Sequence, residues 1–297
     1  MEAIIEQHLS TFGEEYRRVE VAFFGGNFTG LPVELQVDYL SAVARFREQG
    51  LVQSIRLSTR PDYMTPAILD ILFQYGVGAI ELGAQSTDPE VLKLSGRGHS
   101  ADQVEEASEL ILKGGFDLGL QMMVGLPADT LQKTMKTASR FVELGASQVR
   151  IYPTLVIRNT PLANLFKQGK YTPLQLQEAI EICKELVLFF EKNSVKVLRV
   201  GLHPSEGLIS GAELLAGPFH PAFKELVETA IWADILHGVV LEKEIGKTVE
   251  VRVSSKQINA AIGHKAANKK RLIELFKRVK FVGDNKLIGR QYHVGNC

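Results

Sequence analysis

Glycine and polar residues recur directly after the apolar, β-branched runs of this 297-residue chain. The carboxyl ends of parallel strands lie along one edge of a sheet, and α/β proteins bind their ligands at this edge. The candidate groups are the bare backbone of Gly25 and Gly26, the amides of Asn27 and Gln85, and the guanidinium of Arg60. Amides and guanidinium groups form hydrogen bonds with polar and anionic ligands. We therefore expect several loops to line a single pocket, although their spacing alone does not name the ligand.

The elements that must position these groups alternate between strands and helices up to about residue 200. Apolar runs predict six strands, near 19–24, 54–58, 78–82, 117–124, 148–152 and 196–200. Segments with helical periodicity predict helices near 33–49, 66–75, 101–113, 129–144 and 172–193. Such alternation is typical of a parallel sheet covered by helices. The sequence therefore predicts an α/β fold, either barrel-like or doubly wound.

Composition and missing motifs argue against several classes of protein. The chain has 34 basic and 34 acidic residues, which argues against a polybasic protein that coats nucleic acid or membranes with its whole surface. Its two cysteines, Cys183 and Cys297, cannot form a disulfide framework, and a reducing cytoplasm fits best. No run approaches the roughly 20 apolar residues of a membrane span. The glycine-rich signatures of dinucleotide and nucleoside triphosphate sites are also missing.

Five ordered segments carry a more specific signal. They are VAFFGGNFTGLP, IRLSTRPDY, GAIELGAQSTDPEVLKLSGRGHSADQV, GFDLGLQMMVGLPADT and VRIYPTLVIRNTPL. In this order and at these separations they resemble the radical S-adenosylmethionine (SAM) superfamily, in particular the radical domain of the Elongator catalytic subunit and its shorter bacterial homologues. The oxygen-independent coproporphyrinogen oxidases look like a more distant branch. The resemblance covers about residues 1–235.

This resemblance implies a fold and a chemistry. The family fold is a partial (β/α)6 TIM-like barrel, in which a Cys-x3-Cys-x2-Cys loop after the first strand holds a [4Fe-4S] cluster. The open iron of the cluster chelates S-adenosylmethionine. An electron that reaches the cluster from a reducing donor breaks the sulfur–C5′ bond, and the 5′-deoxyadenosyl radical abstracts hydrogen from the substrate. The protein must place that carbon against the substrate and exclude water and oxygen.

The resemblance also implies which residues bind the methionine part of the cofactor. Gly25, Gly26 and Asn27 follow the second family strand, where bare backbone can approach the methionine amino group. Ser58 and Arg60, at the end of the third family strand, should face the carboxylate or the ribose.

Four further residues are implied around the carboxylate and the nucleoside. Arg97 matches a family arginine that pairs with the methionine carboxylate, a planar anion that suits its forked donors. Gln85 would bind the ribose hydroxyls, and Gln121 stands where the porphyrinogen-oxidase branch has an aspartate for the ribose. Gly125 would bring backbone close to the adenine.

The chain departs from the family pattern at the cluster, because the Cys-x3-Cys-x2-Cys loop is absent. Cys183 lies in the predicted helix 172–193 as a core residue, and Cys297 is the last residue. About eighteen residues of predicted helix precede the second family strand, so the first strand and its cluster loop would lie upstream of Met1. We therefore expect an N-terminally truncated chain, without the first barrel strand, that cannot cleave S-adenosylmethionine. The alternative is a natural homologue that has lost its cluster and acts as a binding module.

The segment after about residue 245 has a different character. Between Lys256 and Arg290 it carries ten basic and two acidic residues, a net charge of +8. Its pattern predicts, in order, a strand, a helix, a loop, a helix and a strand, at 248–253, 255–262, 263–266, 267–277 and 279–282. This order resembles the KH RNA-binding core, with Gly263-His264-Lys265-Ala266 where that module has Gly-x-x-Gly.

The KH resemblance implies contacts with a single-stranded RNA backbone. The candidate RNA-binding residues are Gly263, His264, Lys265, Lys269, Lys270 and Arg271. Ala266 replaces the second glycine of the motif and weakens the match. A solvated basic face on a small α/β appendage is the alternative.

These observations divide the chain into three parts and favour one function. The parts are a partial radical SAM barrel (1–200), a helical extension (201–245) and a small basic α/β domain (246–297). The leading function is an Elongator-like radical SAM enzyme. RNA, with tRNA as one candidate, is the favoured substrate because the resemblance and the basic segment agree. A coproporphyrinogen-oxidase-like enzyme is an alternative that leaves the basic segment without a role. A cluster-less RNA-binding protein is an alternative of another class.

Overall fold

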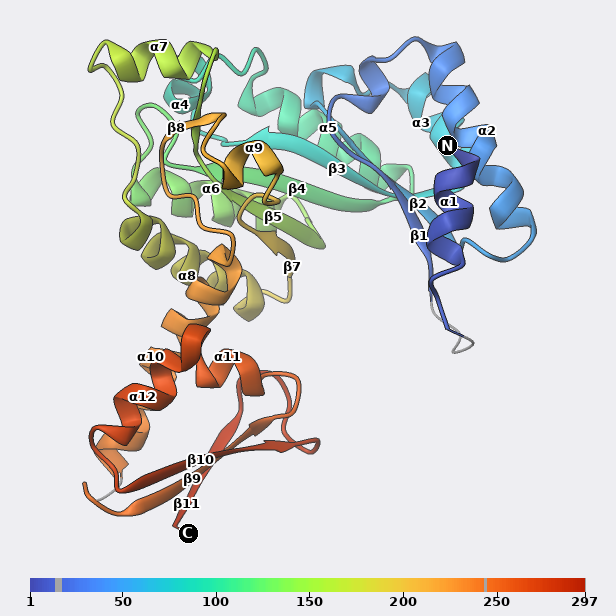
Figure 1. Ribbon diagram of the computed structural model, residues 1–297. Helices are drawn as coiled ribbons and strands as arrows, with labels where there is room; N and C mark the ends of the chain where they lie inside the picture. Colours follow the sequence, from blue (N-terminus) through green and yellow to red (C-terminus); the bar gives the residue numbers. More distant parts are fainter. Residues whose placement is uncertain (14–17, 243–244, 297) are drawn as a thin grey trace. The chain divides into compact units, whose positions relative to one another are not determined.

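Six parallel strands form the framework of the first two thirds of the chain in the computed structural model, which describes residues 1–13, 18–242 and 245–296. They lie in the order β1-β2-β3-β4-β5-β7 and curl into a half-barrel (Figure 1). Their bounds are Glu20–Phe23, Ser54–Thr59, Val77–Gln85, Asp117–Val124, Gln148–Pro153 and Lys196–Val200. This confirms the predicted partial barrel, and each predicted strand lies within a few residues of its expected position.

Helices connect these strands, and local caps set where they begin. Five helices match predicted ones: α2 (Val33–Glu48), α3 (Pro66–Gln74), α5 (Ala101–Lys113), α6 (Leu131–Glu143) and α8 (Leu176–Lys192). Helix α4 (Pro89–Leu94) is additional. Ser100 and Gln103 form a capping box that begins α5. The Thr130 hydroxyl accepts a hydrogen bond from the Lys133 amide, so α6 begins at Leu131 and not at residue 129. At the N-terminus α1 spans only Glu2–Leu9, and residues 14–17 of the predicted helix lie outside the described residues.

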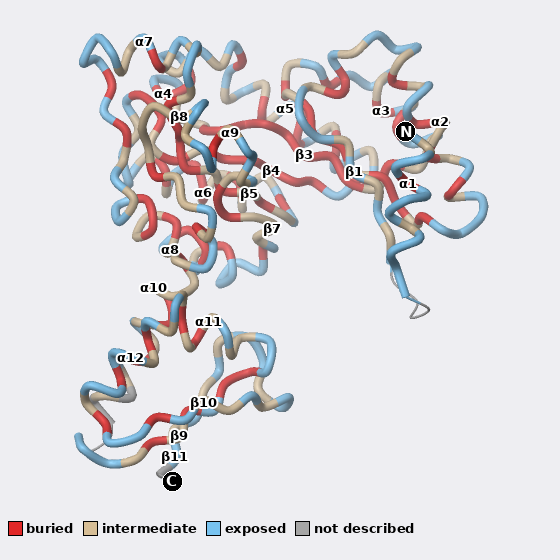
Figure 2. Tube along the Cα trace, viewed as in Figure 1, coloured by how far each residue is buried: buried red, intermediate tan, exposed pale blue. Residues whose placement is uncertain are grey.

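The two faces of the half-barrel differ in chemistry. On the outer face Leu57, Leu82 and Leu120 are fully buried, and helices such as α5 and α6 contact the central strands there. Figure 2 shows β3 and β4 as mostly buried. Alternate residues of the same strands point to the opposite face. That face lines the lumen of the half-barrel and is polar, with Arg56 on β2 and Arg150 on β5 among its members.

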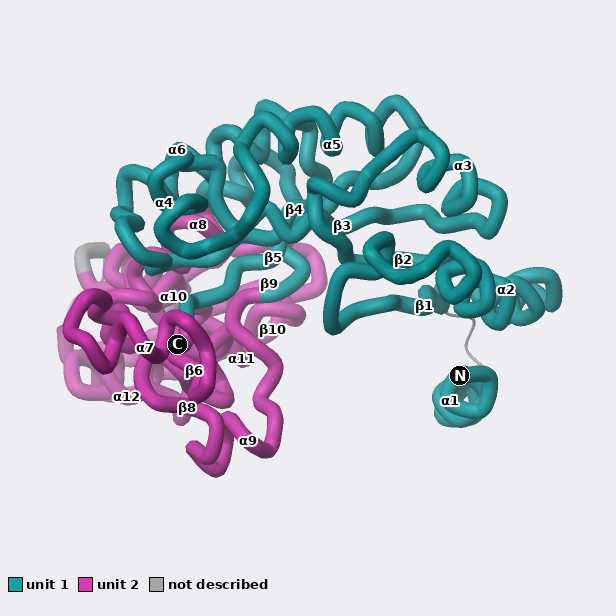
Figure 3. Tube along the Cα trace, turned by 90° about the horizontal axis from the view of Figure 1, so that it is seen from above, with its two compact units in different colours: residues 1–154, 189–199 teal, residues 155–188, 200–297 magenta. Residues whose placement is uncertain are grey.

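The chain divides into two compact units, shown in Figure 3. Unit 1 contains residues 1–154 and 189–199, and unit 2 contains residues 155–188 and 200–297. The first part of unit 2 holds short elements that the sequence pattern does not predict: β6 (Val156–Ile157), α7 (Pro161–Lys167), α9 (Glu206–Ile209) and β8 (Leu214–Ala216). The division of the chain at residues 200 and 245 stays a prediction.

The rest of unit 2 contains the basic segment. The elements are α10 (Phe223–Glu242), β9 (Thr248–Ser254), α11 (Ile258–Ile262), α12 (Ala267–Ile273), β10 (Arg278–Asp284) and β11 (Tyr292–Asn296). Strand β9 pairs in parallel with β10 and antiparallel with β11. The predicted order of strand, helix, loop, helix and strand is confirmed for β9 to β10, whereas β11 lies beyond the predicted elements. Helix α12 ends four residues before the predicted end, at Ile273.

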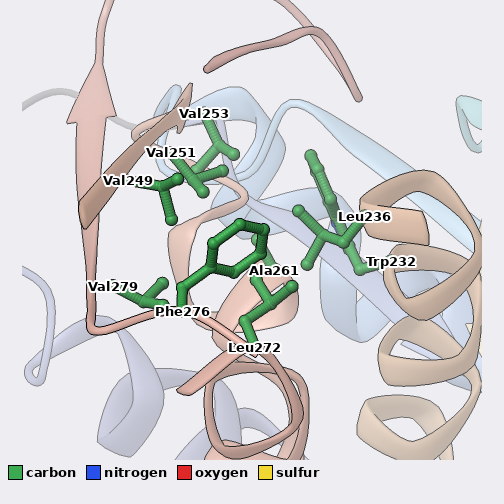
Figure 4. Packing of buried hydrophobic residues seen from close by; sticks show 9 residues of the cluster. All are labelled: Trp232, Leu236, Val249, Val251, Val253, Ala261, Leu272, Phe276 and Val279. Atoms are coloured by element: carbon green, nitrogen blue, oxygen red, sulfur yellow. The ribbon is translucent and has the colours of Figure 1, made fainter. Parts of the chain in front are cut away.

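The helices of this segment pack against one face of its sheet around an apolar cluster (Figure 4). Val249, Val251 and Val253 alternate along β9 and are fully buried, because successive strand residues face opposite sides. Trp232 on α10 and Phe276 after α12 are buried against the same cluster. Burial of these large side chains provides a hydrophobic core for the segment.

Among the described residues no helix is long and apolar enough to cross a membrane.

Candidate functional site

The loop after β1 leaves its backbone open at two successive glycines. Gly25 has a φ of +106°, which favours glycine, and a Cβ at Gly25 or Gly26 would meet no atom within 4 Å. Asn27 is fixed to the end of β2, because its Oδ1 accepts hydrogen bonds from the Thr59 hydroxyl (2.6 Å) and the Arg60 backbone amide (3.3 Å). The loop lines a cavity of about 240 Å³ together with Ser58, Phe23, Phe24, Phe28, Leu31 and Tyr39.

Arg60, directly after β2, and Arg97, after α4, lie close enough for their charges to interact. Of these two, only Arg60 has an acidic partner among the described residues. Arg60 donates two hydrogen bonds to Asp62, at 2.9 and 2.8 Å. Arg97 makes no ion pair with any described residue, and its Nε is buried without a hydrogen-bond partner. Burial lowers the pKa of Arg97, and the positive charge of Arg60 lowers this pKa further. An anion bound beside Arg97 would supply the missing negative charge.

Three buried side chains at the same edge of the sheet have polar atoms without a partner. These atoms are Oε1 of Gln85, Nδ1 of His99 and Oγ1 of Thr154, and each side chain is at least nine-tenths buried. The Nε2–H of His99 donates to the Ala84 carbonyl at 3.0 Å, which leaves Nδ1 as an acceptor. Burial lowers the pKa of His99, so the ring is neutral near pH 7. The edge therefore offers both donors and acceptors to a ligand.

A network of charged side chains fills the lumen below this edge. The carboxylate of Glu81 is 1% exposed and accepts hydrogen bonds from Arg56 (3.0 Å), Arg150 (3.0 Å) and Gln121 (3.1 Å). The Gln121 amide also donates to the Ser58 hydroxyl, at 2.9 Å. Gln121 and Ser58 therefore lie together in the lumen, on β4 and β2.

The loop after β4 is held by one carboxylate. Asp129 accepts hydrogen bonds from the Gly125 amide (2.9 Å) and the Thr134 hydroxyl (2.9 Å). Burial raises the pKa of Asp129, and these hydrogen bonds oppose part of that rise. The Gly125 backbone is thereby fixed at the carboxyl end of β4.

The structure places the nine predicted cofactor residues in unit 1. Eight of them lie on β2 to β4 or directly beyond the ends of β1, β2 or β4, whereas Arg97 lies in the segment between α4 and α5. The six predicted RNA-binding residues lie in unit 2, in the loop between α11 and α12 and on α12. The predicted cofactor residues do not include Glu81, His99 and Thr154. Thr154 directly follows β5, and Glu81 is part of a polar alternation along the strands, so both carried a readable signal.

The loop between α11 and α12 has an unusual backbone. Gly263, Lys265 and Ala266 have φ values of +86°, +51° and +60°. The His264 amide donates to the Thr229 hydroxyl on α10 at 2.7 Å, and its ring packs edge-on against His220 with centroids 5.5 Å apart. The side chain of Lys265, the residue after His264, is exposed.

The thiols of this chain do not fit a thiolate-bound cluster, which needs three of them at one point. Cys183 is fully buried in α8, and burial raises its pKa to about 12, as expected for a core residue. Cys297 lies outside the described residues. Within the described ranges, no group of three histidine, cysteine or acidic side chains could hold a metal ion.

Comparisons with known proteins agree with this fold. The radical SAM superfamily model matches residues 2–141, and the model of the radical SAM C-terminal domain matches residues 146–233. The chain therefore belongs to the radical SAM superfamily.

Its similar relatives are of the Elongator type. The tRNA uridine(34) acetyltransferase of Methanocaldococcus infernus is 29% identical over 200 residues, which cover 61% of this chain and 37% of that protein. Elongator complex protein 3 of Homo sapiens is 30% identical over 204 residues, with 62% and 37% covered. The structure of the archaeal M. infernus Elp3 with an N-terminal deletion has a TM-score of 0.67 and 25% identity, and the match covers 81% of this chain and 58% of that one. The chain spans just over a third of the length of these curated relatives.

The raised pKa of Asp129 predicts a pH dependence of stability. A carboxyl group whose pKa is higher in the folded state binds more protons when folded, so its contribution to stability falls as pH rises through that interval. We expect Asp129→Asn to remove this fall. The measurement is urea unfolding of both proteins from about pH 4 to pH 7, with Asp117→Asn as the control that removes an exposed carboxyl. If the free energies of unfolding of wild type and Asp129→Asn differ by the same amount at every pH, the prediction is wrong.

Proposed function

We propose that unit 1 binds S-adenosylmethionine as part of a radical SAM enzyme of the Elongator branch, and that its substrate is RNA, with tRNA favoured. The observation that carries the proposal is the set of buried polar atoms without partners at the carboxyl edge of a radical SAM half-barrel. Such atoms cost roughly 1–3 kcal/mol each when nothing pairs with them. A polar ligand bound at this edge would pair with them.

The residues present fit S-adenosylmethionine. Arg97, which makes no ion pair with a described residue, would take its carboxylate, and the open backbone of Gly25 and Gly26 would approach its amino group. Gln85, whose Oε1 makes no hydrogen bond, would bind a ribose hydroxyl. Bound at a reduced [4Fe-4S] cluster, S-adenosylmethionine would supply the 5′-deoxyadenosyl radical.

Two other predicted cofactor residues, Arg60 and Asn27, already have hydrogen-bond partners within the protein. Both Arg60 contacts to Asp62 use its guanidinium, and Asn27 is bound to the end of β2. These two residues support the proposed pocket mainly by fixing its walls. Gly125, whose amide is bonded to Asp129, offers backbone to the adenine.

The cluster ligands are not among the residues of this chain that the structure describes. The proposal therefore assigns the chain the cofactor-binding half of the site, and the chain by itself does not cleave S-adenosylmethionine. The complete enzyme would need three cluster thiolates, a reducing electron donor and an RNA substrate. A reducing cytoplasm suits such an enzyme and the free, buried thiol of Cys183.

Anaerobic iron–sulfide reconstitution of this chain should give neither stoichiometric [4Fe-4S] absorbance nor 5′-deoxyadenosine. The reason is that two thiols, one of them buried in α8, cannot replace three converging thiolates. Cys183→Ala is the matched control and should give the same background absorbance. A stoichiometric cluster together with 5′-deoxyadenosine release would overturn this part of the proposal.

The role of Arg97 is tested by comparing two ligands. Arg97→Ala should weaken binding of S-adenosylhomocysteine, which carries the carboxylate, by about tenfold or more, because charged hydrogen bonds contribute about 1.5–3 kcal/mol. Binding of adenosine, which lacks the carboxylate, should not change. Isothermal titration calorimetry measures both affinities, and Lys93→Ala is the control for loss of a nearby exposed cation. Equal losses for the two ligands would count against a carboxylate contact.

The basic segment of unit 2 supports RNA as the substrate. Lys265, Lys270 and Arg271 are exposed, and Lys269 is partly exposed beside them on α12. No ion pair with a described residue neutralises these four side chains. Cations of this kind bind phosphates through charge and release counterions as they do so.

The triple variant Lys269→Ala, Lys270→Ala and Arg271→Ala should bind a single-stranded RNA oligonucleotide more weakly than wild type. It should also reduce the slope of log K against log salt by about 2, since each phosphate contact to a single strand contributes about 0.7. Fluorescence anisotropy at several salt concentrations measures both quantities. Lys192→Ala, which removes an exposed cation in unit 1, is the control. An unchanged slope in the triple variant would show that these residues make no phosphate contacts.

A further inference from the structure

Glu81 connects four strands of the half-barrel from a position that water hardly reaches. Its carboxylate contacts Arg56 on β2, Gln121 on β4 and Arg150 on β5. Arg56 in turn donates to Glu20 on β1 (2.8 Å) and to the Gln148 side chain on β5 (2.6 Å). One buried anion therefore joins polar side chains that come from most of the sheet.

The contact with Glu81 decides which polar atom of the Gln121 amide is left for a ligand. An ionised carboxylate only accepts hydrogen bonds, so the NH2 group of Gln121 must face it. The two N–H donors of this group are used by Glu81 (3.1 Å) and by the Ser58 hydroxyl (2.9 Å). The polar atom that remains is Oε1, which can only accept, and no described residue donates a hydrogen bond to it.

Glu81 also reaches the loop after β1. Arg150, which it holds by two hydrogen bonds, lies over the ring of Phe24 with 4.5 Å between the guanidinium carbon and the ring centroid. Phe24 directly precedes the open backbone of Gly25 and Gly26 and lines the same cavity. A cation held against an aromatic face restricts both side chains.

We propose that Glu81 is a positioning residue that makes Gln121 an obligate acceptor for a ligand hydroxyl. The inference rests on the proposed function, in which the hydroxyl belongs to the ribose of the adenosyl group. A purely structural ion cluster would stabilise the half-barrel without affecting which hydroxyl analogues bind. The two roles therefore differ in ligand discrimination and not only in stability.

The test compares adenosine with its 2′-fluoro-2′-deoxy and 3′-fluoro-3′-deoxy analogues, because fluorine cannot donate a hydrogen bond. Wild type should prefer adenosine to one of these analogues by roughly five- to tenfold, the effect of one hydrogen bond. In Glu81→Gln the two arginines claim the single amide oxygen of the new side chain. Its NH2 group then faces Gln121 and turns that amide over, so the preference should fall to about onefold. Calorimetric titration gives each affinity, and Glu105→Gln, which removes a surface carboxylate paired with Arg140, should keep the wild-type preference.

Circular dichroism establishes whether Glu81→Gln folds, since loss of the anion leaves the partly buried guanidinium groups of Arg56 and Arg150 without this partner. If it does not fold, the triple variant Glu81→Leu, Arg56→Met and Arg150→Met removes the cations together with the anion. Gln121 then has no carboxylate to orient it, and the preference for adenosine should again fall to about onefold. If a folded variant still prefers adenosine to the analogue, the proposed role of Glu81 is overturned and the proposed function stands. Wild type that binds no adenosine at all overturns the proposed function and this inference with it.

Discussion

A carboxylate that is almost without solvent contact lies between two arginines in the lumen of the half-barrel, and the side chains around it are arranged to satisfy it. Removing charges from water costs several kcal/mol per ion, so such a cluster seldom stabilises a fold more than apolar packing would. The outer face of the same sheet, with Leu57, Leu82 and Leu120 fully buried, provides the apolar packing. The network of Glu81 therefore makes sense as a means of keeping the lumen polar and ordered, which a polar ligand requires.

The need to pair buried polar groups also applies at the carboxyl edge of the sheet. Seven buried side-chain atoms lack a hydrogen-bond partner among the described residues, and four of them belong to Gln85, Arg97, His99 and Thr154. Native proteins rarely leave such groups unpaired. The four gather at the edge where a parallel sheet binds its ligand. The lumen network lies below this edge, where the Glu81 carboxylate is paired with Arg56, Gln121 and Arg150. The four unpaired atoms at the edge therefore indicate where a polar ligand would bind.

Strand and helix positions followed from periodicity, because apolar runs and caps act over a few residues. The ordered motifs named Gln85 and Arg97, each of which has one buried polar atom without a hydrogen-bond partner among the described residues; their role in cofactor binding stays a prediction. The role of Glu81 was not predictable in the same way, because its partners Arg56, Gln121 and Arg150 are far apart in the chain and meet only when the strands curl. Short elements such as β6 and β8 also escaped prediction, since two or three residues carry no period. Strand β11 pairs antiparallel with β9, and so falls outside the alternation on which the prediction depended.

In unit 2 the sequence showed the charge but not how it is presented. Two successive non-glycine residues, Lys265 and Ala266, have positive φ, a conformation that costs free energy unless the surroundings enforce it. The surroundings here are the Thr229 hydroxyl, which accepts from the His264 amide, and Asn268, whose side chain donates to the carbonyls of Thr229 and Ala261. A loop fixed in this way before binding loses less conformational entropy when a partner arrives. The hydrogen bonds to Thr229 on α10 therefore hold the loop before α12 in one conformation. Net charge alone does not provide such a defined shape for the basic surface of α12.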